Sequence, residues 1–211
     1  MLPTKLLIAT HNPGKVREYR ALLADLPLEV TYLDAEGITF EVDETGATFA
    51  ENAILKARTY AATSGLLTWA DDSGLEVDAL HGAPGVYSAR YGAPAAHSDA
   101  DRVRYLLAKL ASVPEADRTA RFRCVVALAT PAGEVQTVDG ACEGRIGDEP
   151  RGEHGFGYDP IFLLADYGYR LTLAELEPAT KNLISHRGRA AGQARDELME
   201  LTEINQPKDV S

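Results

Sequence analysis

The chain has 211 residues, enough for one large domain or for one domain of two lobes. Hydrophobic residues make up 45%, which is enough for a core, and 32 acidic residues against 21 basic ones give a net charge of −11. This balance argues against a protein that binds the phosphate backbone of nucleic acids, because such proteins present a basic surface. A small anionic ligand is still allowed, since it needs only a few well-placed cations.

Cysteine usage and hydropathy bear on the compartment. Cys124 and Cys142 lack the spacing of metal ligands, suit a reducing cytosol, and are expected to be small core residues. No apolar stretch approaches the ~20 residues of a membrane span. The apolar run that follows Met1–Lys5 is also too short for a secretory signal. We therefore expect a cytoplasmic protein with no membrane partner.

The first expected elements are a strand, a loop and a helix. Leu6–Ala9 is a continuous apolar run, typical of a strand buried on both faces, and a helical spacing of apolar residues begins at Val16. The connecting loop is Thr10-His11-Asn12-Pro13-Gly14-Lys15, and a loop of this kind can present backbone N–H groups to a phosphate. It matches neither of the common phosphate-binding fingerprints. The residues alone favour an ordinary turn.

A second strand and a long helix come next. Leu28–Leu33 favours a strand, and the acidic segment 34–46 favours a loop. Thr48 and Glu51 have the spacing of a capping box, which predicts a helix to about Ser64 that ends at Gly65. Asn52 and Lys56 are four residues apart and share one face of this helix. That face could look into a cleft, although a surface pair is the commoner arrangement.

Two adjacent carboxylates follow a short buried strand at Leu66–Ala70. Asp71, Asp72, Ser73 and Gly74 come next, and we expect the chain to turn at Gly74 before another strand at Leu75–Leu80. If the strand continued, Asp71 and Asp72 would point to opposite faces, one toward a ligand and one supporting the loop. A carboxylate at a strand end suits Mg²⁺. Turn formation explains the same residues equally well.

The middle of the chain predicts a loop, a helix and two long strands. The loop 82–92 is punctuated by glycine and carries one hydroxyl group and one arginine, and Ser98 or Asp99 caps a helix that reaches about Leu110. Phe122–Thr130 and Val135–Ile146 favour strands joined by a hairpin turn at residues 131–133. The fold class is therefore α/β, with a mixed β-sheet flanked by helices.

Near the C-terminus, aromatic residues and cations lie in positions that suggest a ligand. Phe156 and Tyr158 lie between glycines in a loop with Asp159, where they could stack on a planar ligand or plug a sheet edge. A short capped helix is expected at Thr172–Leu176, stopped by Pro178, and the last helix begins after Ser185 as its N-cap. His186 and Arg187 would then lie in its first turn, against the dipole preference, which suggests an anion or an electron-rich group nearby.

The motifs together resemble a known family. In chain order they are Thr10–Lys15, Glu44-Thr45-Gly46 with Thr48-Phe49 and Glu51-Asn52-Ala53, Ala70–Leu75, Gly85–Tyr91, Phe156–Pro160 and Ser185–Gly188. The chain closely resembles the inosine triphosphate pyrophosphatase family from Leu7 to about Ala190. The resemblance implies an α/β mixed sheet in two lobes with a central cleft, and a homodimer. We expect one such domain over residues 1–205 and a disordered tail at 206–211.

The resemblance also implies roles for individual residues. It makes Asp72 the catalytic acceptor and Mg²⁺ ligand, and it makes Ser73 a substrate contact. The phosphate-binding residues would be Thr10, His11, Asn12, Pro13, Gly14 and Lys15. The base-binding residues would be Phe156, Gly157, Tyr158, Asp159, Lys181, His186 and Arg187. Two departures stand out: Asp43-Glu44 replaces a pair that is often Glu-Glu, so that either residue could be the second metal ligand, and His11 replaces a smaller residue.

The expected reaction is hydrolysis of a non-standard purine nucleoside triphosphate to the monophosphate and pyrophosphate. Mg²⁺ held by Asp72 and by Asp43 or Glu44 would neutralise phosphate charge, and Lys15 and Lys56 would stabilise the leaving pyrophosphate. Asp72 could accept a proton from the attacking water directly or through a metal-bound water, and the sequence leaves both routes open.

The choice of base is expected to depend on hydrogen-bond donors of the protein. Arg187 and charged Lys181 can only donate, so they suit the 6-carbonyl of inosine, deoxyinosine and xanthosine triphosphates and oppose the 6-amino group of adenosine triphosphate. The residue that rejects guanine is not identified. Two alternatives are a Maf-type pyrophosphatase, disfavoured by the residues around Phe156 and Arg187, and a nucleotide-binding sensor, disfavoured by the presence of Asp72.

Overall fold

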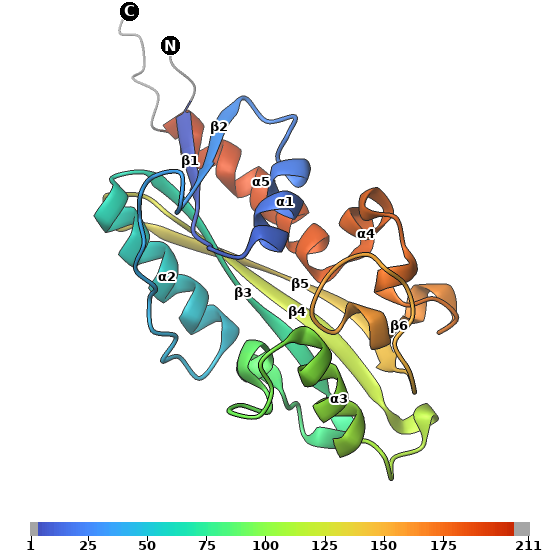
Figure 1. Cartoon of the computed structure of the whole chain (residues 1–211). Helices are drawn as coiled ribbons and strands as arrows, with labels where there is room; N and C mark the ends of the chain where they lie inside the picture. The colour runs from blue at the N-terminus through green and yellow to red at the C-terminus, as the bar shows by residue number, and fades with distance from the viewer. Residues whose placement is uncertain (1–3, 205–211) are drawn as a thin grey trace, which may run out of the picture. The chain divides into compact units, whose positions relative to one another are not determined.

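The computed structural model describes residues 4–204 of the chain (Figure 1). The expected disordered tail, 206–211, lies outside the described residues. In chain order the helices and strands are β1 (Thr4–Ile8), α1 (Pro13–Leu22), β2 (Leu28–Tyr32), α2 (Phe49–Ser64), β3 (Leu67–Val77), α3 (Asp99–Lys109), β4 (Thr119–Ala129), β5 (Val135–Ile146), β6 (Phe162–Leu164), α4 (Pro178–Ile184) and α5 (His186–Ile204).

Capping residues set the helix ends where the sequence predicts them. Thr48 and Glu51 form the capping box of α2, and Gly65 ends the helix in the left-handed conformation at φ 68°. Ser98 caps α3 in a capping box with Asp101. At the start of α5, the Ser185 hydroxyl oxygen accepts the N–H of Gly188 at 3.1 Å. Each cap satisfies backbone groups that the helix leaves without partners.

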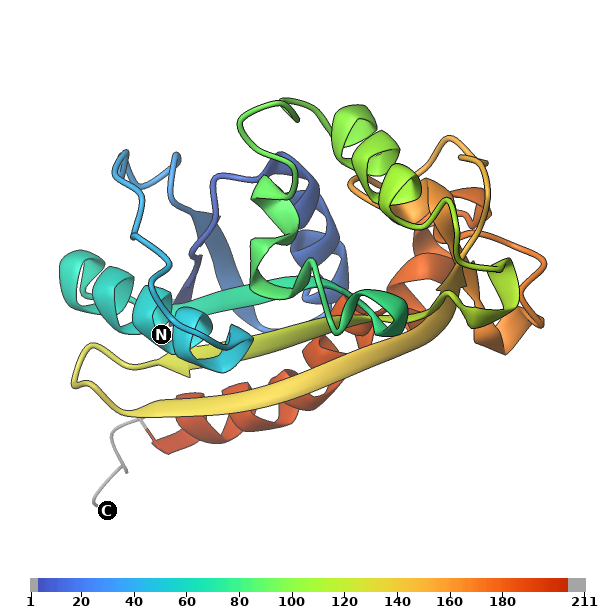
Figure 2. The same ribbon diagram turned by 90° about the horizontal axis from the view of Figure 1, so that it is seen from below.

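The strands form one six-stranded sheet in the order β2-β1-β3-β4-β5-β6. β1 pairs in parallel with both β2 and β3, whereas β5 and β6 are antiparallel. β4 and β5 run side by side and are joined by a hairpin, in which Gly133 has φ 95° (Figure 2). The predicted mixed α/β sheet is therefore confirmed. Within residues 4–204, the helices are too short or too polar for any of them to cross a membrane.

The chain divides into two compact units. Unit 1 comprises the described parts of Met1–Asp72, Val125–Asp139 and Ala190–Ser211, and unit 2 comprises Ser73–Cys124 and Gly140–Arg189. Their boundaries cut β3, β4 and β5, so each of these strands contributes one part to either unit. The boundary within β3 falls at the Asp72–Ser73 peptide bond.

In unit 1, helices α1 and α2 cover opposite faces of β3 (Figure 1). Tyr19 of α1 packs edge-on against Trp69, with ring centroids 5.2 Å apart. Asn52 of α2 instead bonds Asp72, three residues farther along the strand. Because successive strand side chains alternate between faces, odd-numbered and even-numbered residues of β3 meet different helices. This alternation also separates Asp71 from Asp72.

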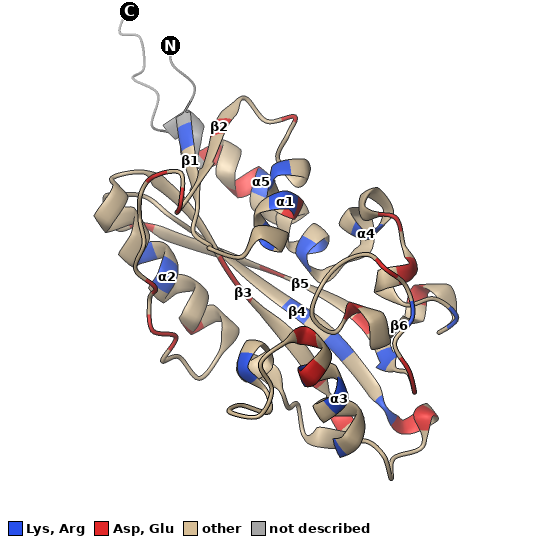
Figure 3. Cartoon of the chain, viewed as in Figure 1, with Lys and Arg blue, Asp and Glu red and all other residues tan. Residues whose placement is uncertain are grey.

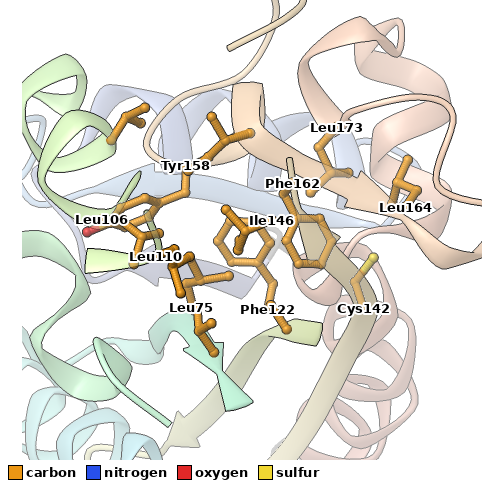
Figure 4. Close-up of a cluster of buried hydrophobic side chains, with 14 of the residues drawn as sticks. Leu75, Leu106, Leu110, Phe122, Cys142, Ile146, Tyr158, Phe162, Leu164 and Leu173 are labelled. Atoms are coloured by element: carbon orange, nitrogen blue, oxygen red, sulfur yellow. The ribbon is translucent and has the colours of Figure 1, made fainter. Parts of the chain in front are cut away.

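Unit 2 has its own hydrophobic core (Figure 4). Phe122 of β4 and Phe162 of β6 pack with their ring centroids 4.7 Å apart. Leu75, Ile146 and Cys142 belong to the same buried cluster. Cys142 and Cys124 are both buried and reduced, which confirms their predicted place in the core. Burial raises the pKa of the Cys142 thiol to about 11, so it stays protonated and unreactive at neutral pH.

The structure corrects the predicted turn at Gly74. β3 runs without interruption from Leu67 to Val77, and Gly74 is a buried strand residue. The predicted second strand, Leu75–Leu80, is the end of β3, because residues 78–80 form a short 3₁₀ helix. β3 lies between β1 and β4 in the sheet. The place of β3 within the sheet outweighs the turn preference of Asp, Ser and Gly.

A second correction concerns the segment before α5. Pro178 does not stop a helix but occupies the first turn of α4. A proline there is favourable because its missing N–H would have no partner in the helix, and its φ already suits helical geometry. The capped turn predicted at Thr172 is present, but it is a 3₁₀ helix of three residues, Leu173–Glu175.

Candidate functional site

Asp71 and Asp72 point to opposite faces of β3. A carboxylate oxygen of Asp71 lies 2.9 Å from the ammonium group of Lys15, near the start of α1. Asp72 accepts a hydrogen bond from Asn52 Nδ2 at 3.0 Å, and its other oxygen is 3.6 Å from Lys56 Nζ. The predicted alternation is thus confirmed, and it gives each aspartate a lysine of its own.

Lys56 is buried between carboxylates. Its ammonium group donates to Glu44 Oε1 at 2.5 Å in addition to its contact with Asp72. Figure 3 shows acidic residues on β3 and on the loop before α2, with basic residues on α2. Burial alone would lower the pKa of Lys56, but the charges of Asp72, Asp71 and Glu44 raise it above its ordinary value. Lys56 is therefore a permanent cation at neutral pH.

For Asp72, the surroundings disfavour the charged form of the side chain. Burial is the largest effect on its carboxyl group and raises its pKa, and Glu44 raises it further, while Lys56 and Asn52 act against both. The net result is a pKa above the ordinary value for aspartate. A carboxylate with a raised pKa is a stronger base than an ordinary one, and perturbed groups of this kind concentrate at functional sites.

The loop that carries Glu44 is fixed against α2. The N–H of Gly46 donates to Asn52 Oδ1 at 2.7 Å, so the Asn52 amide joins this loop to Asp72. A Cβ atom at position 46 would lie only 2.6 Å from Asn52 Oδ1, so only glycine allows this approach. Glu44 is half-buried beside Lys56, whereas the neighbouring Asp43 is exposed.

The carboxylates offer two oxygen-bearing groups to a metal ion. Among residues 4–204 there is no cluster of three or more His, Cys, Asp or Glu side chains that could hold a metal ion by themselves. Mg²⁺ is commonly held by one or two carboxylates, with waters and substrate phosphates completing its shell. Asp72 and Glu44, which both contact Lys56, therefore fit Mg²⁺ bound together with a phosphate-bearing substrate.

The loop between β1 and α1 is organised by its own side chains. Asn12 caps α1, because its Oδ1 accepts the N–H groups of Gly14 at 2.8 Å and Lys15 at 3.2 Å. Thr10 Oγ1 accepts the N–H of Asn12, and Pro13 begins the helix. His11, the residue that departs from the family pattern, pairs with Asp34 at 2.6 Å. Lys15 is the cation that this loop places beside β3.

In unit 2, two cations lie over the ring of Phe156. Lys181 Nζ is 5.0 Å and Arg187 Cζ is 5.4 Å from the ring centroid. Both cationic side chains are buried, whereas Phe156 is only half-buried. An aromatic ring beside two buried cations is a suitable platform for a planar base that carries hydrogen-bond acceptors.

Asp159 holds this arrangement together. Its carboxylate accepts the N–H of Phe156 at 2.9 Å and the ammonium group of Lys181 at 2.6 Å, and it is buried. A Cβ atom at Gly155 would lie 2.1 Å from the same carboxylate, so the loop can close over Asp159 only with glycine there. Asp159 thus bonds groups within the protein, in addition to its expected role toward the base.

Arg187 and His186 lie in the first turn of α5, in the part of this helix that belongs to unit 2. Arg187 Nη2 donates to the hydroxyl oxygen of Ser73 at 3.0 Å. The His186 ring stacks on Phe122 with centroids 4.7 Å apart and planes inclined by 13°. Arg187 therefore lies beside Ser73 and Phe156, as expected for one recognition group, while His186 packs on the core.

Two predicted base contacts are anchored differently. Tyr158 is buried in the core of unit 2, and its hydroxyl group donates to the carbonyl oxygen of Ser88 at 3.0 Å. The N–H of Gly157 donates to Asp99 Oδ2 at 2.8 Å. The sequence did not identify Ser88 or Asp99 as members of this group. Their only signal was a hydroxyl group in a glycine-rich loop and a carboxylate at a helix start.

The chain matches the model of the Ham1 family over residues 6–197. A protein of Exiguobacterium named dITP/XTP pyrophosphatase is 51% identical over 92% of this chain and 97% of its own length. A protein of the same name from Bacillus licheniformis is 50% identical over 88% of this chain and 93% of its own. The solved structure of a HAM1 protein from Coxiella burnetii is 42% identical, has a TM-score of 0.83, and covers 93% of this chain and 99% of its own.

Proposed function

Because this chain belongs to the Ham1 family, we propose that it hydrolyses deoxyinosine, inosine and xanthosine triphosphates to the monophosphate and pyrophosphate. One observation carries the proposal: the buried ammonium group of Lys56 contacts both Asp72 and Glu44. A buried cation with two carboxylates, one of them with a raised pKa, suits a reaction at a phosphate group.

Asp72 and Glu44 are our proposed metal ligands. Glu44 is preferred to Asp43 because its carboxylate lies at Lys56, whereas Asp43 is exposed. Mg²⁺, the metal we propose, would neutralise phosphate charge and polarise the bond to be broken when bound. Asp72 is also our proposed proton acceptor, either directly or through a metal-bound water.

The lysines are assigned to the triphosphate. Lys56 is held as a cation by its neighbours, so it can stabilise charge that develops on the leaving pyrophosphate. Lys15 lies near the start of α1, where the helix dipole also favours anions. Thr10, His11, Asn12, Pro13 and Gly14 form the loop around it and belong to the same proposed phosphate-binding set.

The base is assigned to residues of unit 2. Phe156 would stack on the purine, and Arg187 would donate to its 6-carbonyl group, beside Ser73. Lys181 is a second donor, shared with Asp159. Gly157, Tyr158 and His186 complete the proposed set by shaping the loop and the helix start. Asp72, which we assign to the metal and the triphosphate, is followed directly in the chain by Ser73, which we assign to the base.

We further propose that the enzyme acts in the cytoplasm as a homodimer. Its two cysteines are small buried core residues, which suits a reducing compartment. Sedimentation at several protein concentrations would test the dimer. A monomer at every concentration would contradict it.

The direct test is release of pyrophosphate with Mg²⁺ across inosine, deoxyinosine, xanthosine, guanosine, adenosine and pyrimidine nucleoside triphosphates. We expect turnover of the first three and little of the others. Binding without turnover would instead indicate a nucleotide sensor. Preferred turnover of pyrimidine nucleotides would indicate a Maf-type activity. Orthophosphate released without pyrophosphate would show that a different bond is broken.

A further inference from the structure

The motif Gly85–Tyr91 has no role in the proposed reaction, yet one of its residues is a buried junction. The Ser88 side chain lies in a short 3₁₀ helix and is buried. Its hydroxyl oxygen accepts the N–H of Leu75 at 2.9 Å, and its O–H group donates to the carbonyl oxygen of Gly85 at 2.6 Å. A serine hydroxyl can donate and accept at the same time, so this group uses both capacities.

The backbone of Ser88 makes a third bond. Its carbonyl oxygen accepts the hydroxyl group of Tyr158 at 3.0 Å. Tyr158 is 4% exposed and lies among the core side chains in Figure 4. Burial raises the pKa of Tyr158 far above its ordinary value, so the phenol remains a protonated donor at neutral pH.

These bonds lead to both halves of the base-binding group. On one side, Leu75 is two residues after Ser73, whose hydroxyl oxygen accepts the hydrogen bond from Arg187. On the other side, Tyr158 is two residues after Phe156, over whose ring Arg187 lies at 5.4 Å. Ser88 therefore bonds both to β3, whose Ser73 positions the guanidinium group of Arg187, and to the loop that carries the ring of Phe156.

We propose that Ser88, with Tyr158 as its partner, is a positioning residue that sets the spacing between Phe156 and Arg187 and so determines base discrimination. The inference rests on the proposed function, because it assumes that these two residues contact the purine. Hydrogen-bonded recognition depends on fixed donor positions. A looser Phe156 loop would weaken contacts with inosine triphosphate more than contacts with adenosine triphosphate, which already lacks the matching acceptor.

Two variants test the two sides of the junction. Tyr158→Phe keeps the buried ring and removes only the bond to the Ser88 carbonyl group. Ser88→Ala removes the acceptor for the Leu75 N–H. The readout is the ratio of kcat/KM for inosine triphosphate to that for adenosine triphosphate. A loss of folded protein lowers both values equally and leaves this ratio unchanged.

We expect Tyr158→Phe to lower the ratio about tenfold, mostly through a higher KM for inosine triphosphate, which is the size of one lost buried hydrogen bond. We expect at least as large a change for Ser88→Ala, and a double variant whose loss is smaller than the product of the two. Tyr105→Phe is the matched control, because among the described residues its hydroxyl group has no hydrogen-bond partner. This control should keep the ratio.

An unchanged ratio in both Tyr158→Phe and Ser88→Ala, with inosine triphosphate still hydrolysed, would overturn the positioning role and leave the proposed function intact. A fall of the same size in Tyr105→Phe would also overturn it. Absence of pyrophosphate release by the unmodified chain would instead remove the proposed function, and the positioning role with it.

Discussion

The charged residues of unit 1 and those of unit 2 balance their charge in different ways. In unit 1, the carboxylates of Asp71, Asp72 and Glu44 surround the ammonium groups of Lys15 and Lys56. In unit 2, Lys181 has the carboxylate of Asp159, but Arg187 bonds the neutral hydroxyl group of Ser73. The first group favours an added cation and the second favours an electron-rich acceptor. The ratio of carboxylates to cations in each group therefore indicates which ligand that group would take.

Removal of one carboxylate from unit 1 is the strongest way to break this comparison. Asp72→Asn keeps the shape of the side chain but removes the charge that we assign to Mg²⁺ and to proton transfer. We expect pyrophosphate release to fall by ~10³-fold or more. We also expect Mg²⁺ to raise the Tm of the unmodified chain but not that of the variant. Circular dichroism should show that the fold is intact.

Asp71→Asn is the matched control for that variant. Asp71 lies on the opposite face of β3 and contacts Lys15, so its loss should reduce turnover much less. Near-normal turnover in a folded Asp72→Asn variant would contradict the assignment. So would an equal loss in both variants.

Removal of the shared cation should affect every substrate alike. Lys56→Ala leaves Asp72 and Glu44 close together without the ammonium group between them. We expect the free energy of unfolding to fall by about 3 kcal/mol, because a buried charge pair has lost one partner. We expect turnover to fall ~10²-fold with inosine, deoxyinosine and xanthosine triphosphates, since phosphates carry no base identity. A loss confined to one base would show that Lys56 belongs to base recognition.

Arg187→Ala sharpens the comparison from the other unit. The variant removes the donor that we assign to the 6-carbonyl group, so turnover of inosine triphosphate should fall. The ratio of kcat/KM for inosine triphosphate to that for adenosine triphosphate should fall ~10-fold or more. Arg189→Ala is the control, because Arg189 lies on the same helix but bonds the Ala141 carbonyl oxygen and Asp166. If this ratio is unchanged in Arg187→Ala, Arg187 does not recognise the 6-carbonyl group.

The smallest effect is expected at an exposed pair in unit 2. Arg121 and Thr119 hold the pKa of Asp78 below its ordinary value of 3.8. A lowered pKa contributes stability that is present above the ordinary pKa and is lost as pH falls through the lowered one. Asp78→Ala should therefore lower the free energy of unfolding by about 0.5 kcal/mol at pH 7. The difference should fade below pH ~4 in urea titrations. A constant difference across this range would contradict the ion-pair origin.

Local chemistry was the part of the fold that the sequence predicted well. Thr48 with Glu51, and Ser185 with Gly188, cap their helices because a cap depends only on residues a few positions apart. Gly74 was misjudged because its conformation is decided by strands far away in the chain. Pro178 fits both a helix stop and a helix start, and only the following turn distinguishes them.

The candidate site divides in the same way. Alternation along β3 correctly predicted that Asp71 and Asp72 diverge, because it follows from strand geometry alone. The contacts of Asp159 with Lys181 and of Tyr158 with Ser88 join residues 22 and 70 positions apart. No spacing rule links residues so distant, and the resemblance named only some of the partners. Long-range contacts of this kind needed the three-dimensional structure.

The uninterrupted course of β3 through Asp72 and Ser73 limits how the chain can change length. Side chains on a strand have a period of two, so one inserted residue before Asp72 would turn its carboxylate away from Asn52 and Lys56 and toward α1. The same insertion would shift Ser73 relative to Arg187. Length changes should therefore accumulate in loops such as the hairpin at residues 131–133, while this strand keeps a constant residue count across working relatives.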